Sequence, residues 1–492
     1  MSLKKGAAIA MVLCLSLVLL SGCGAGKEHG LDAKNPTVIT IWHYYNGVQQ
    51  DTFDRMLVEF NETVGLEKGI VVEARSKNSI NDLAEAALAA LRRNEDEAEG
   101  ESMEAAPDMF TAYAETAYVA DQMGAVVDLS KYFTAKELEE YIPGYLEEGS
   151  LDEKGGLKIF PTAKSTEMVM LNVTDWTPFA EATGVTTDDL TTWERLAETA
   201  EKYYEYTDAL TPDIPNDGKA FFGRDSVANY MIIGARQLGL VFVSTESGEA
   251  VLNEDKDVIR RLWDNYYAPY VKGYYAANAR FRSDDIMLGE IIAMACSSTG
   301  ATYFPATVTL NDEYSYPIEG VVLPVPNFEG AEPYIVQQGA GMVVVKSEEK
   351  REYACSVFLK WFTEKERNIT FSALSGYLPV KKDANNFEAI AASYQEKGDQ
   401  ANTIMLNSID VAVSEINHFT SYAAKPFAKS AETRAFLESY IQKTAQTAHA
   451  EAVARIEAGE DRAAVMTEYV SDEAFESWYE GFISGLRAAS EL

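Results

Sequence analysis

The residues best suited to bind a small polar molecule form an aromatic cluster close to the amino-terminus. It consists of Trp42, His43, Tyr44 and Tyr45, at the end of the β-branched run 37–42 that predicts a strand. Flat rings stack on the apolar faces of sugars, while ring nitrogens and hydroxyl groups bond to their polar rims. The cluster therefore predicts ligand contacts on a loop, with core packing beneath the loop as the alternative for each ring.

Further polar and aromatic residues follow other predicted strands and turns. Tyr113 and Glu115 come after the predicted strand 107–112, so both can reach the sheet edge that the aromatic cluster occupies. Tyr377 follows a Ser-Gly turn and is a candidate lid aromatic. Trp193 begins a predicted helix and is either a stacking platform or a core anchor. Just after Pro161, four hydrogen-bonding residues stand together, namely Lys164, Ser165, Thr166 and Glu167.

The motifs of the common catalytic sites are missing from the sequence. There is no Gly-x-Ser-x-Gly elbow, no His-Glu-x-x-His pair and no glycine-rich phosphate loop. Paired carboxylates discriminate nothing in so acidic a chain, and the 4 histidines leave few candidates for a general base. We therefore expect a binding protein without cofactor or metal. A surface hydrolase and a structural or adhesion lipoprotein are the competing classes.

The first 22 residues have the pattern of a lipoprotein signal peptide. Lys4 and Lys5 precede an apolar run over 7–20, and small residues then lead to Cys23. That run is too short for a comfortable membrane span. We predict a signal peptide over 1–22, lipid attachment at Cys23 and a flexible, Gly-rich tether over 23–36. An ordinary signal peptide that happens to contain a cysteine is the alternative.

The charge balance restricts the partners of the exported chain. The formal net charge is −35, and removal of the signal segment takes away two lysines and no acid. Because such a body repels nucleic acid and anionic lipid surfaces, no nucleic-acid partner is expected. Solubility accounts for this charge, and attraction of a cationic substrate is the sharper alternative. Cys296 and Cys355 have apolar or small neighbours and predict two buried thiols, with a disulfide between them left open.

The predicted elements follow the pattern of an α/β protein. Alternating strands and helices over 37–112 predict a parallel sheet, whose strand ends form the edge where such sheets bind ligands. The alternation returns further along, with strands predicted at 158–162, 168–172, 290–294, 320–324 and 341–345. Beyond residue 381 the pattern is mainly helical, most strongly over 431–459 and 462–489.

An ordered set of segments resembles extracellular solute-binding protein family 1, the group around maltose-binding protein. The segments are 38–74, 107–115 with 124–129, 160–172, 289–298, Leu323-Pro324-Val325-Pro326 and the helix that ends in Trp361-Phe362. Together they cover roughly residues 37–380. Each segment is weakly diagnostic alone, but their order and the lipoprotein signal strengthen the resemblance.

The resemblance implies a two-lobe periplasmic-binding-protein-like fold, with a hinge and a long helical C-terminal extension of open role. Lobe 1 would hold 37–148 and 304–365, and lobe 2 would hold 149–303 and 366–492. The segment from Lys164 to Glu167 would then have a ligand or hinge role. Ser298 and Gln338 would lie where the chain returns to the cleft between the lobes.

The resemblance also implies a function. The protein would be a monomeric substrate-binding lipoprotein of an ABC importer, held on the outer face of the cell membrane and recognised by the permease when closed. A mono- or oligosaccharide is the expected solute, and a glycerol phosphodiester or a polyamine is the alternative. The negative charge disfavours a highly anionic ligand unless a local arginine, such as Arg224 or Arg280, reverses the field.

Overall fold

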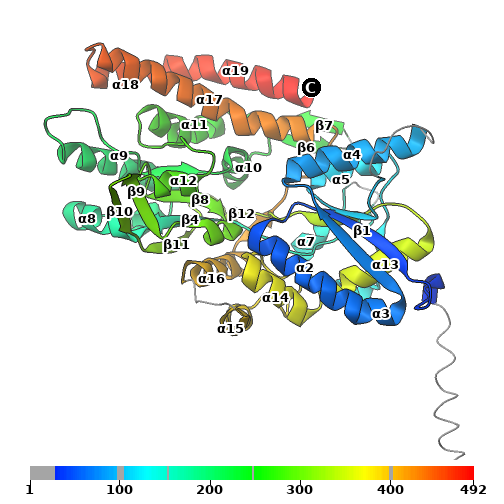
Figure 1. The fold of residues 1–492 in the computed structure, drawn as a ribbon. Coiled ribbons are helices and arrows are strands. Elements are labelled where there is room, and N and C mark those ends of the chain that lie inside the picture. The colour runs from blue at the N-terminus through cyan, green and yellow to red at the C-terminus, as the bar shows by residue number, and fades with distance from the viewer. Residues whose placement is uncertain (1–27, 97–104, 152–154, 247–248, 398–402) are drawn as a thin grey trace, which may run out of the picture.

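Two four-stranded sheets form the centres of two lobes that lie side by side (Figure 1). The computed structural model describes residues 28–96, 105–151, 155–246, 249–397 and 403–492. The predicted signal peptide over 1–22 and the lipid site at Cys23 lie outside these residues. The structure confirms the predicted α/β class with two lobes.

The sheet of the first lobe has the strand order β13-β3-β1-β2. Its strands are β1 (Thr37–His43), β2 (Ile70–Ser76), β3 (Met109–Ala112) and β13 (Gly341–Val344). β1 runs parallel to both of its neighbours, as the alternating pattern predicts, and β13 pairs antiparallel to β3. The carboxyl ends of β1 and β3 therefore meet at one edge of the sheet.

Helices cover both faces of this sheet. One apolar cluster joins Phe53 and Phe60 of α2 to Phe358 of α13, and another joins Leu83 of α4 to Ala117 of α5. The helices of this lobe are α2 (Gly47–Glu62), α3 (Val64–Lys68), α4 (Ile80–Asp96), α5 (Ala114–Gln122), α6 (Ala135–Leu138), α7 (Pro143–Glu147), α13 (Glu349–Phe362) and α14 (Lys365–Ser375).

The sheet of the second lobe has the strand order β11-β4-β8-β5. Its strands are β4 (Glu167–Asn172), β5 (Phe222–Arg224), β8 (Ala293–Ser297) and β11 (Gly320–Pro324). Only β5 and β8 are parallel. The strand predicted over 158–162 is not regular; Phe160 makes a single bridge to Met342.

The expected lobe boundaries need two corrections. β11 pairs with β4 in the second sheet, so residues 320–324 do not belong to lobe 1 as the range 304–365 had it. α14 packs against α2 of the first lobe as well as against α15, so residues 366–375 lie at the boundary between the lobes and not wholly in the second. Both points depend on strand pairing and helix packing between residues far apart in the sequence. The amino-acid composition does not reveal these contacts.

The second lobe carries the remaining helices and hairpins. The helices are α8 (Val173–Thr183), α9 (Trp193–Ala209), α10 (Val227–Gln237), α11 (Lys256–Val271), α12 (Arg282–Met287), α15 (Phe387–Lys397) and α16 (Thr403–His418). The hairpins join β6 (Val243–Glu246) to β7 (Glu249–Leu252) and β9 (Thr307–Asn311) to β10 (Tyr314–Pro317). Two short strands, β12 (Tyr334–Val336) and β14 (Thr420–Tyr422), pair in parallel. Within the described ranges, none of the helices combines the length and the apolar character needed to cross a bilayer.

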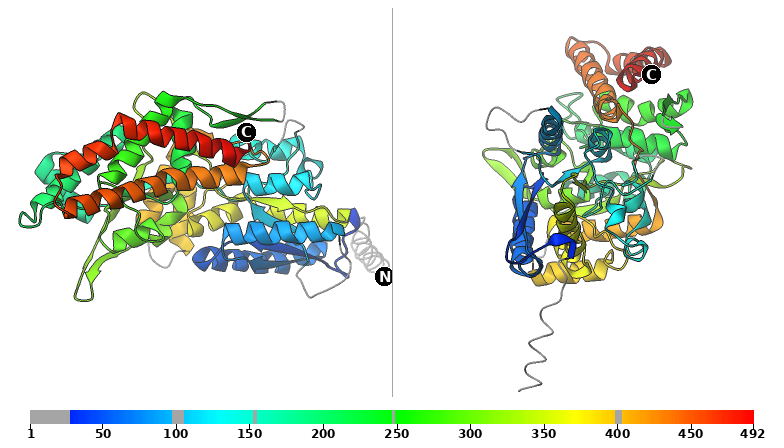
Figure 2. Two further views of the ribbon diagram at one scale, coloured as in Figure 1. Left: turned by 90° about the horizontal axis from the view of Figure 1, so that it is seen from above. Right: turned by 90° about the vertical axis from the view of Figure 1, so that its right-hand side faces the viewer.

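The predicted helical extension packs onto the second lobe as part of its core. It comprises α17 (Ser430–Glu457), α18 (Arg462–Tyr469) and α19 (Asp472–Ser490). Leu437 and Ile441 of α17 and Phe482 of α19 are buried in the same apolar cluster as Trp263 of α11. Seen from above, α17 (orange) runs along the second lobe and reaches α5 of the first (Figure 2).

The chain crosses between the lobes in three segments, the first at residues 164–165, the second near 338 and the third near 378. The three segments hydrogen-bond to one another. Ser165 and Gln338 exchange two backbone bonds of 3.0 and 2.9 Å, and Lys164 and Leu378 exchange two more of 3.1 and 2.6 Å. Adjacent extended segments of this kind form a hinge, because small changes in a few backbone angles rotate one lobe against the other.

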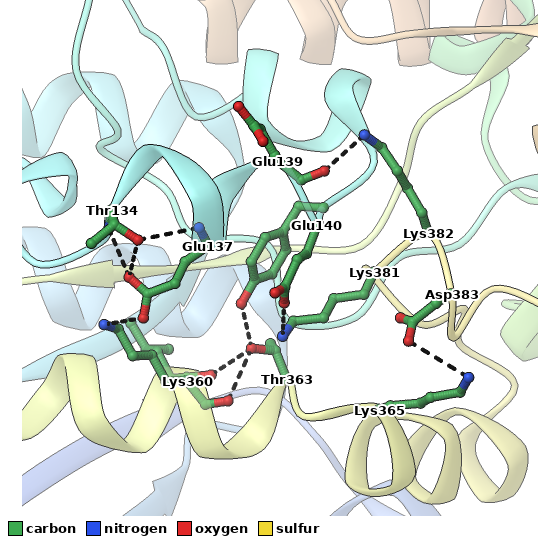
Figure 3. Close-up of polar contacts among 12 residues, drawn as sticks. Thr134, Glu137, Glu139, Glu140, Lys360, Thr363, Lys365, Lys381, Lys382 and Asp383 are labelled. Carbon is green, nitrogen blue, oxygen red and sulfur yellow. Dashed lines mark hydrogen bonds and ion pairs between the residues drawn. The ribbon is translucent and has the colours of Figure 1, made fainter.

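Polar side chains tie the third crossing to the first lobe (Figure 3). Lys381 Nζ lies 2.8 Å from Glu140 Oε2, and Lys382 Nζ donates to the backbone oxygen of Glu139 at 2.8 Å. Lys360 pairs with Glu137 close by. Because these charges are partly exposed, each pair contributes little stability by itself. We therefore infer that their main effect is to fix the position of the third crossing against the first lobe.

The predicted tether is shorter than the range 23–36, because residues 28–36 are docked on the first lobe. The ring of His29 stacks on Tyr353 with centroids 4.0 Å apart, and its Nδ1 lies 3.0 Å from Glu349 Oε1. Leu31 is buried in the core of this lobe. The predicted buried thiols are confirmed: Cys296 and Cys355 are free and lie in different apolar clusters, so they form no disulfide.

Candidate functional site

A cavity of about 150 Å³ lies where the two lobes, the hinge and the C-terminal extension meet. Its lining comes from all four parts: Tyr113, Ala114, Glu115, Glu148, Asn229, Ile232, Ile233, Val241, Phe242, Val243, Val336, Gln337, Gln338, Tyr422, Ala423, Ala424, Lys425, Pro426, Phe427, Ser430, Thr433, Arg434 and Leu437. A wider pocket of about 740 Å³ lies in the second lobe alone, lined in part by His449 and Arg462. Of these two cavities of the described residues, the first is the one contacted by both lobes, so it is the candidate site.

The wall from the first lobe is formed by Tyr113 and Glu115. Tyr113 is the residue before α5, directly after β3, and Glu115 lies in the first turn of that helix. Burial raises the pKa of the Tyr113 hydroxyl, so the group stays protonated and is able both to donate and to accept a hydrogen bond. Both residues lie at the sheet edge, as predicted, and this position brings them to the cavity.

The wall from the second lobe is formed by α10 and the strand that follows it. Asn229, Ile232 and Ile233 of α10 line the cavity together with Phe242. Ser226 caps the helix, accepting from Asn229 N, and Glu438 of α17 accepts from the backbone N–H groups of two further residues in the first turn. These caps hold the start of α10, and with it Asn229, against the cavity.

The roof is formed by the C-terminal extension. Residues 422–427 and the first turns of α17 lie over the cavity. Arg434 Nη2 donates to Asn229 Oδ1 at 2.7 Å, and Asn229 Nδ2 donates to Glu167 Oε1 at 2.8 Å. Glu167 in turn pairs with Arg224 at 2.7 Å. A continuous polar chain therefore fixes Arg434 from the core of the second lobe outward.

The hinge forms the floor. Gln337 Nε2 donates to Glu148 Oε2 and to the backbone oxygen of Gly144. The side-chain oxygen of Gln338 is buried and has no hydrogen-bond partner among the described residues. Since Gln338 also lines the cavity, this acceptor is open to a hydrogen-bond donor there.

Three of the predicted ligand residues line the cavity, and four form or flank the hinge. Tyr113, Glu115 and Gln338 are in the lining. The other four are Lys164, Ser165, Thr166 and Glu167, which are buried in the first crossing and at the start of β4. Of the two roles left open for this segment, the structure favours the hinge.

Lys164 shows why this segment is structural. Its side chain is 1% exposed, and its ammonium group forms an ion pair with Glu148 and donates to the backbone oxygen of Gly339 at 2.8 Å. Both charges of the pair are buried. If either one turned to a solute, the other would be left buried without a partner, which is costly.

Trp42, His43 and Tyr45 of the aromatic cluster pack in the core, which corrects their assignment as ligand contacts. Successive side chains of β1 point to opposite faces of the sheet, and helices cover both faces. Trp42 is 3% exposed and packs against Leu83 of α4. His43 accepts from the backbone N–H of Tyr45 at 3.1 Å, and burial lowers its pKa to about 4, so it is neutral.

The remaining predicted residues also lie outside the cavity lining. The hydroxyl groups of Tyr44 and Tyr377 are 2.8 Å apart and satisfy each other. Ser298 Oγ donates to the backbone oxygen of Gly376 at 3.0 Å. Trp193 is 4% exposed and packs on Tyr230, so it is the core anchor and not the stacking platform.

Sequence reasoning missed the roof of the site and the residues of α10. A Tyr-x-x-x-Pro-Phe segment over 422–427, just before a long helix, was the only signal for the roof. Helical periodicity predicts that 431–459 is a helix, but not that its first turns fold back over the cleft. Asn229 was missed because it lies inside a predicted helix. The sequence does not show which residues of other elements its side-chain amide will contact.

The fold and the cavity between two lobes agree with a family comparison. The model of the family described as bacterial extracellular solute-binding protein matches residues 55–398. The chain belongs to the bacterial extracellular solute-binding proteins. This confirms the resemblance seen in the sequence and places the protein outside the cytoplasm. Members of this family are binding proteins and not enzymes.

Solved structures share the fold at low sequence identity. The cyclic alpha-maltosyl-1,6-maltose binding protein of Arthrobacter globiformis has a TM-score of 0.62 at 18% identity, over 92% of this chain and 100% of that one. UgpB from Mycobacterium tuberculosis, in complex with glycerophosphocholine, has a TM-score of 0.62 at 16% identity, over 91% and 100%. The GacH receptor of Streptomyces glaucescens has a TM-score of 0.62 at 10% identity, over 90% and 99%. No curated protein sequence matches this chain.

Proposed function

We propose that this solute-binding protein captures a mono- or oligosaccharide for an ABC importer by closure of its two lobes, and that it catalyses no reaction. The observation that carries the proposal is the single cavity lined by Tyr113 of the first lobe, Asn229 of the second and Arg434 of the roof. A solute held there contacts both lobes at once, so it favours the closed arrangement over the open one.

The chemistry of the lining supports a sugar. Tyr113, Phe242, Tyr422 and Phe427 bring aromatic rings to the cavity, and amides and hydroxyl groups lie between them. Sugars need this combination, because their ring faces are apolar and their rims are polar. Two of the structural relatives are a cyclic alpha-maltosyl-1,6-maltose binding protein and a receptor solved in complex with acarbose, and this supports the same solute class.

The lobes that close are best divided at the three crossings. The first lobe then comprises the described residues up to about 163 together with about 339–376. The second comprises about 165–337 and the residues from about 384 onward, because residues 380–382 still bond to the first lobe. Reciprocal backbone bonds between the crossings allow rotation without loss of pairing, which suits a hinge.

The proposal includes the membrane anchor and the partner. A lipid on Cys23 holds the protein, as a monomer, on the outer face of the cell membrane, where the closed form meets the permease. The lipoprotein pattern of residues 1–23 supports this. A Cys23→Ala protein should appear in the culture medium, whereas the unchanged protein stays with the cells; equal retention of both would exclude the anchor.

The alternative solutes differ in charge. UgpB, a structural relative, binds glycerophosphocholine, and Arg434 in the cavity lining favours an anionic group. A polyamine is disfavoured, because Arg434 and Lys425 would both repel it.

The test is a thermal-shift and calorimetric screen of residues 24–492 against sugars, sugar acids, sugar phosphates, glycerophosphocholine and spermidine. A matching sugar should raise the melting temperature by several degrees at about 100 times its Kd. Tyr113→Ala should weaken that binding about tenfold or more, because it removes a ring and a hydroxyl from the wall.

Tyr303→Ala, which removes an exposed tyrosine outside the cavity, is the matched control and should bind normally. If no sugar of any charge binds, or if Tyr113→Ala binds as tightly as the control, the proposed carbohydrate site is wrong. Binding of spermidine alone would replace the carbohydrate class by the polyamine class.

A further inference from the structure

Two cationic side chains of the cavity have no carboxylate partner among the described residues. These are Arg434, which is half-buried in the roof, and Lys425, which is exposed. This is unusual in a chain of net charge −35, in which acids outnumber bases by 77 to 42. A cation that stays unpaired in an acid-rich protein, inside a cavity, is available to an anion from outside.

The acids of the cavity do not offset these cations. Glu148 is neutralised by the buried ammonium group of Lys164. Glu115 is the only other carboxylate in the lining. The local balance is therefore positive, opposite in sign to that of the molecule as a whole.

Arg434 is held in position by Asn229 of the second lobe. Asn229 donates to Glu167 with its amide nitrogen and accepts from Arg434 with its amide oxygen. This bond takes one of the five N–H groups of the guanidinium. The guanidinium makes no other hydrogen bond to the described residues, so most of its N–H groups remain available to a ligand.

Two other arginines named from the sequence are excluded from this role by their surroundings. The side chain of Arg224 is 1% exposed, and its charge is paired with Glu167. Arg280 lies next to the ring of Phe281 and is not in the cavity lining. The amino-terminal end of α17 adds to the effect, because Ser430 and Thr433 of its first turns line the cavity and a helix amino-terminus carries a partial positive charge.

We infer that the solute is an acidic sugar, whose single carboxylate or phosphate is bound by Arg434. Lys425 lies in the same cavity lining and attracts the anion on entry. The aromatic rings and amides then bind the sugar body. This inference rests on the proposed carbohydrate function and specifies the charge of its ligand.

The test compares matched sugars that differ only in the acidic group. Isothermal titration of residues 24–492 with glucose, glucuronate and glucose 6-phosphate, and with the galactose and mannose sets, separates carboxylate from phosphate recognition. The acidic member of the binding set should bind at least about tenfold more tightly than the neutral one, as for a hydrogen bond to a charged group. That preference should shrink as salt is raised.

Arg434→Gln should remove the preference while leaving weak binding of the sugar body. Arg434→Lys should retain part of it, because the charge remains and the fork is lost. Arg280→Gln, which removes an equal charge outside the cavity, should leave the preference unchanged. Should Arg434→Gln fail to fold, the ratio of acidic to neutral affinity and its salt dependence in the unaltered protein decide the matter.

Equal binding of a neutral sugar and its acid would overturn this inference and leave the carbohydrate function standing. A preference for the acid that survives Arg434→Gln would overturn the role of this arginine. Binding of glycerophosphocholine with no sugar of either kind would replace the sugar by a phosphodiester. No binding by any probe would count against the proposed function itself.

Discussion

At the scale of single residues, burial separates the candidates for binding from the residues of the core. Trp42 and Trp193 have the chemistry of stacking platforms, but both are almost completely buried. Tyr113, with the same kind of ring, lies in the lining of the cavity. Residue type therefore sets what a side chain can do, and its position on a strand or helix decides whether it meets a solute.

We expect Glu415 to make the stability of the protein depend on pH. The residue is 2% exposed on α16, one carboxylate oxygen accepts from Val325 N at 3.0 Å, and the other has no partner among the described residues. Burial, and to a lesser degree the nearby charge of Glu167, raises the pKa of Glu415 to about 8. The folded protein therefore keeps this carboxyl group protonated at pH values where the unfolded chain ionises it.

The sign of the effect follows from proton binding. Between about pH 4.5 and 8 the folded state holds more protons than the unfolded state at this site, so the free energy of unfolding should fall as pH rises. The slope from this group is at most about 1.4 kcal/mol per pH unit. Urea unfolding at pH 5, 6.5 and 8 should show a flatter dependence for Glu415→Gln than for the unaltered protein.

Glu388→Gln, a change of an exposed glutamate on α15, is the control and should leave the pH dependence as it is. An unchanged slope in Glu415→Gln would mean that this carboxyl group is ionised in the folded protein.

At the scale of elements, α17 connects the core of the second lobe to the site. Glu438 of this helix accepts from Ser226 Oγ and from the backbone N–H groups of Val227 and Ala228, so one helix caps another. Arg434, one turn earlier, bonds to Asn229 on the capped helix. The two contacts together register α17 against α10 beside the cavity.

Glu438→Ala should lower the free energy of unfolding by about 1–2 kcal/mol, because it leaves N–H groups at the start of α10 without an acceptor. It should also weaken solute binding, since Arg434 and Asn229 lose their fixed register. Chemical unfolding and titration with the identified sugar measure the two effects. Glu432→Ala removes an exposed acid from the same helix and should change stability by less than about 0.5 kcal/mol. Comparable losses in both variants would show that the capping contact contributes nothing specific.

At the scale of the whole molecule, the helical extension belongs to the second lobe and is not an appendage. α17 and α19 bury Leu437, Ile441, Phe482 and Leu486 in the largest apolar cluster of that lobe. Removal of these helices would expose the facing surfaces of α10 and α11 to water, at a cost of about 25 cal/mol for each Å² of apolar surface.

A chain that ends at Lys429 should therefore lose its cooperative thermal unfolding and accumulate as insoluble protein. Circular dichroism melts and the soluble yield of the 24–429 and 24–492 chains measure this. A soluble shortened chain that melts cooperatively within a few degrees of the full one would make the extension a separate module. Its ability to bind sugar would then have to be tested without the roof.

The sequence alone was sufficient for the fold class, the first parallel strands, the apolar face of α2 and the helical character of the extension. Each of these depends on local signals: alternation, helical periodicity and turn residues. For the same reason, the placement of Tyr113 and Glu115 after β3 led to the cavity.

Only the tertiary structure decided that Trp42 packs against α4 and that β11 joins the second sheet. It also decided that Lys164 pairs with Glu148, and that Arg434 and Asn229 line one cavity. These outcomes depend on contacts between residues far apart in the chain. Local patterns do not encode which surfaces those contacts bring together. The composition of the cavity also followed from that assembly: in a chain of large negative charge, it brings Arg434 and Lys425 into one lining.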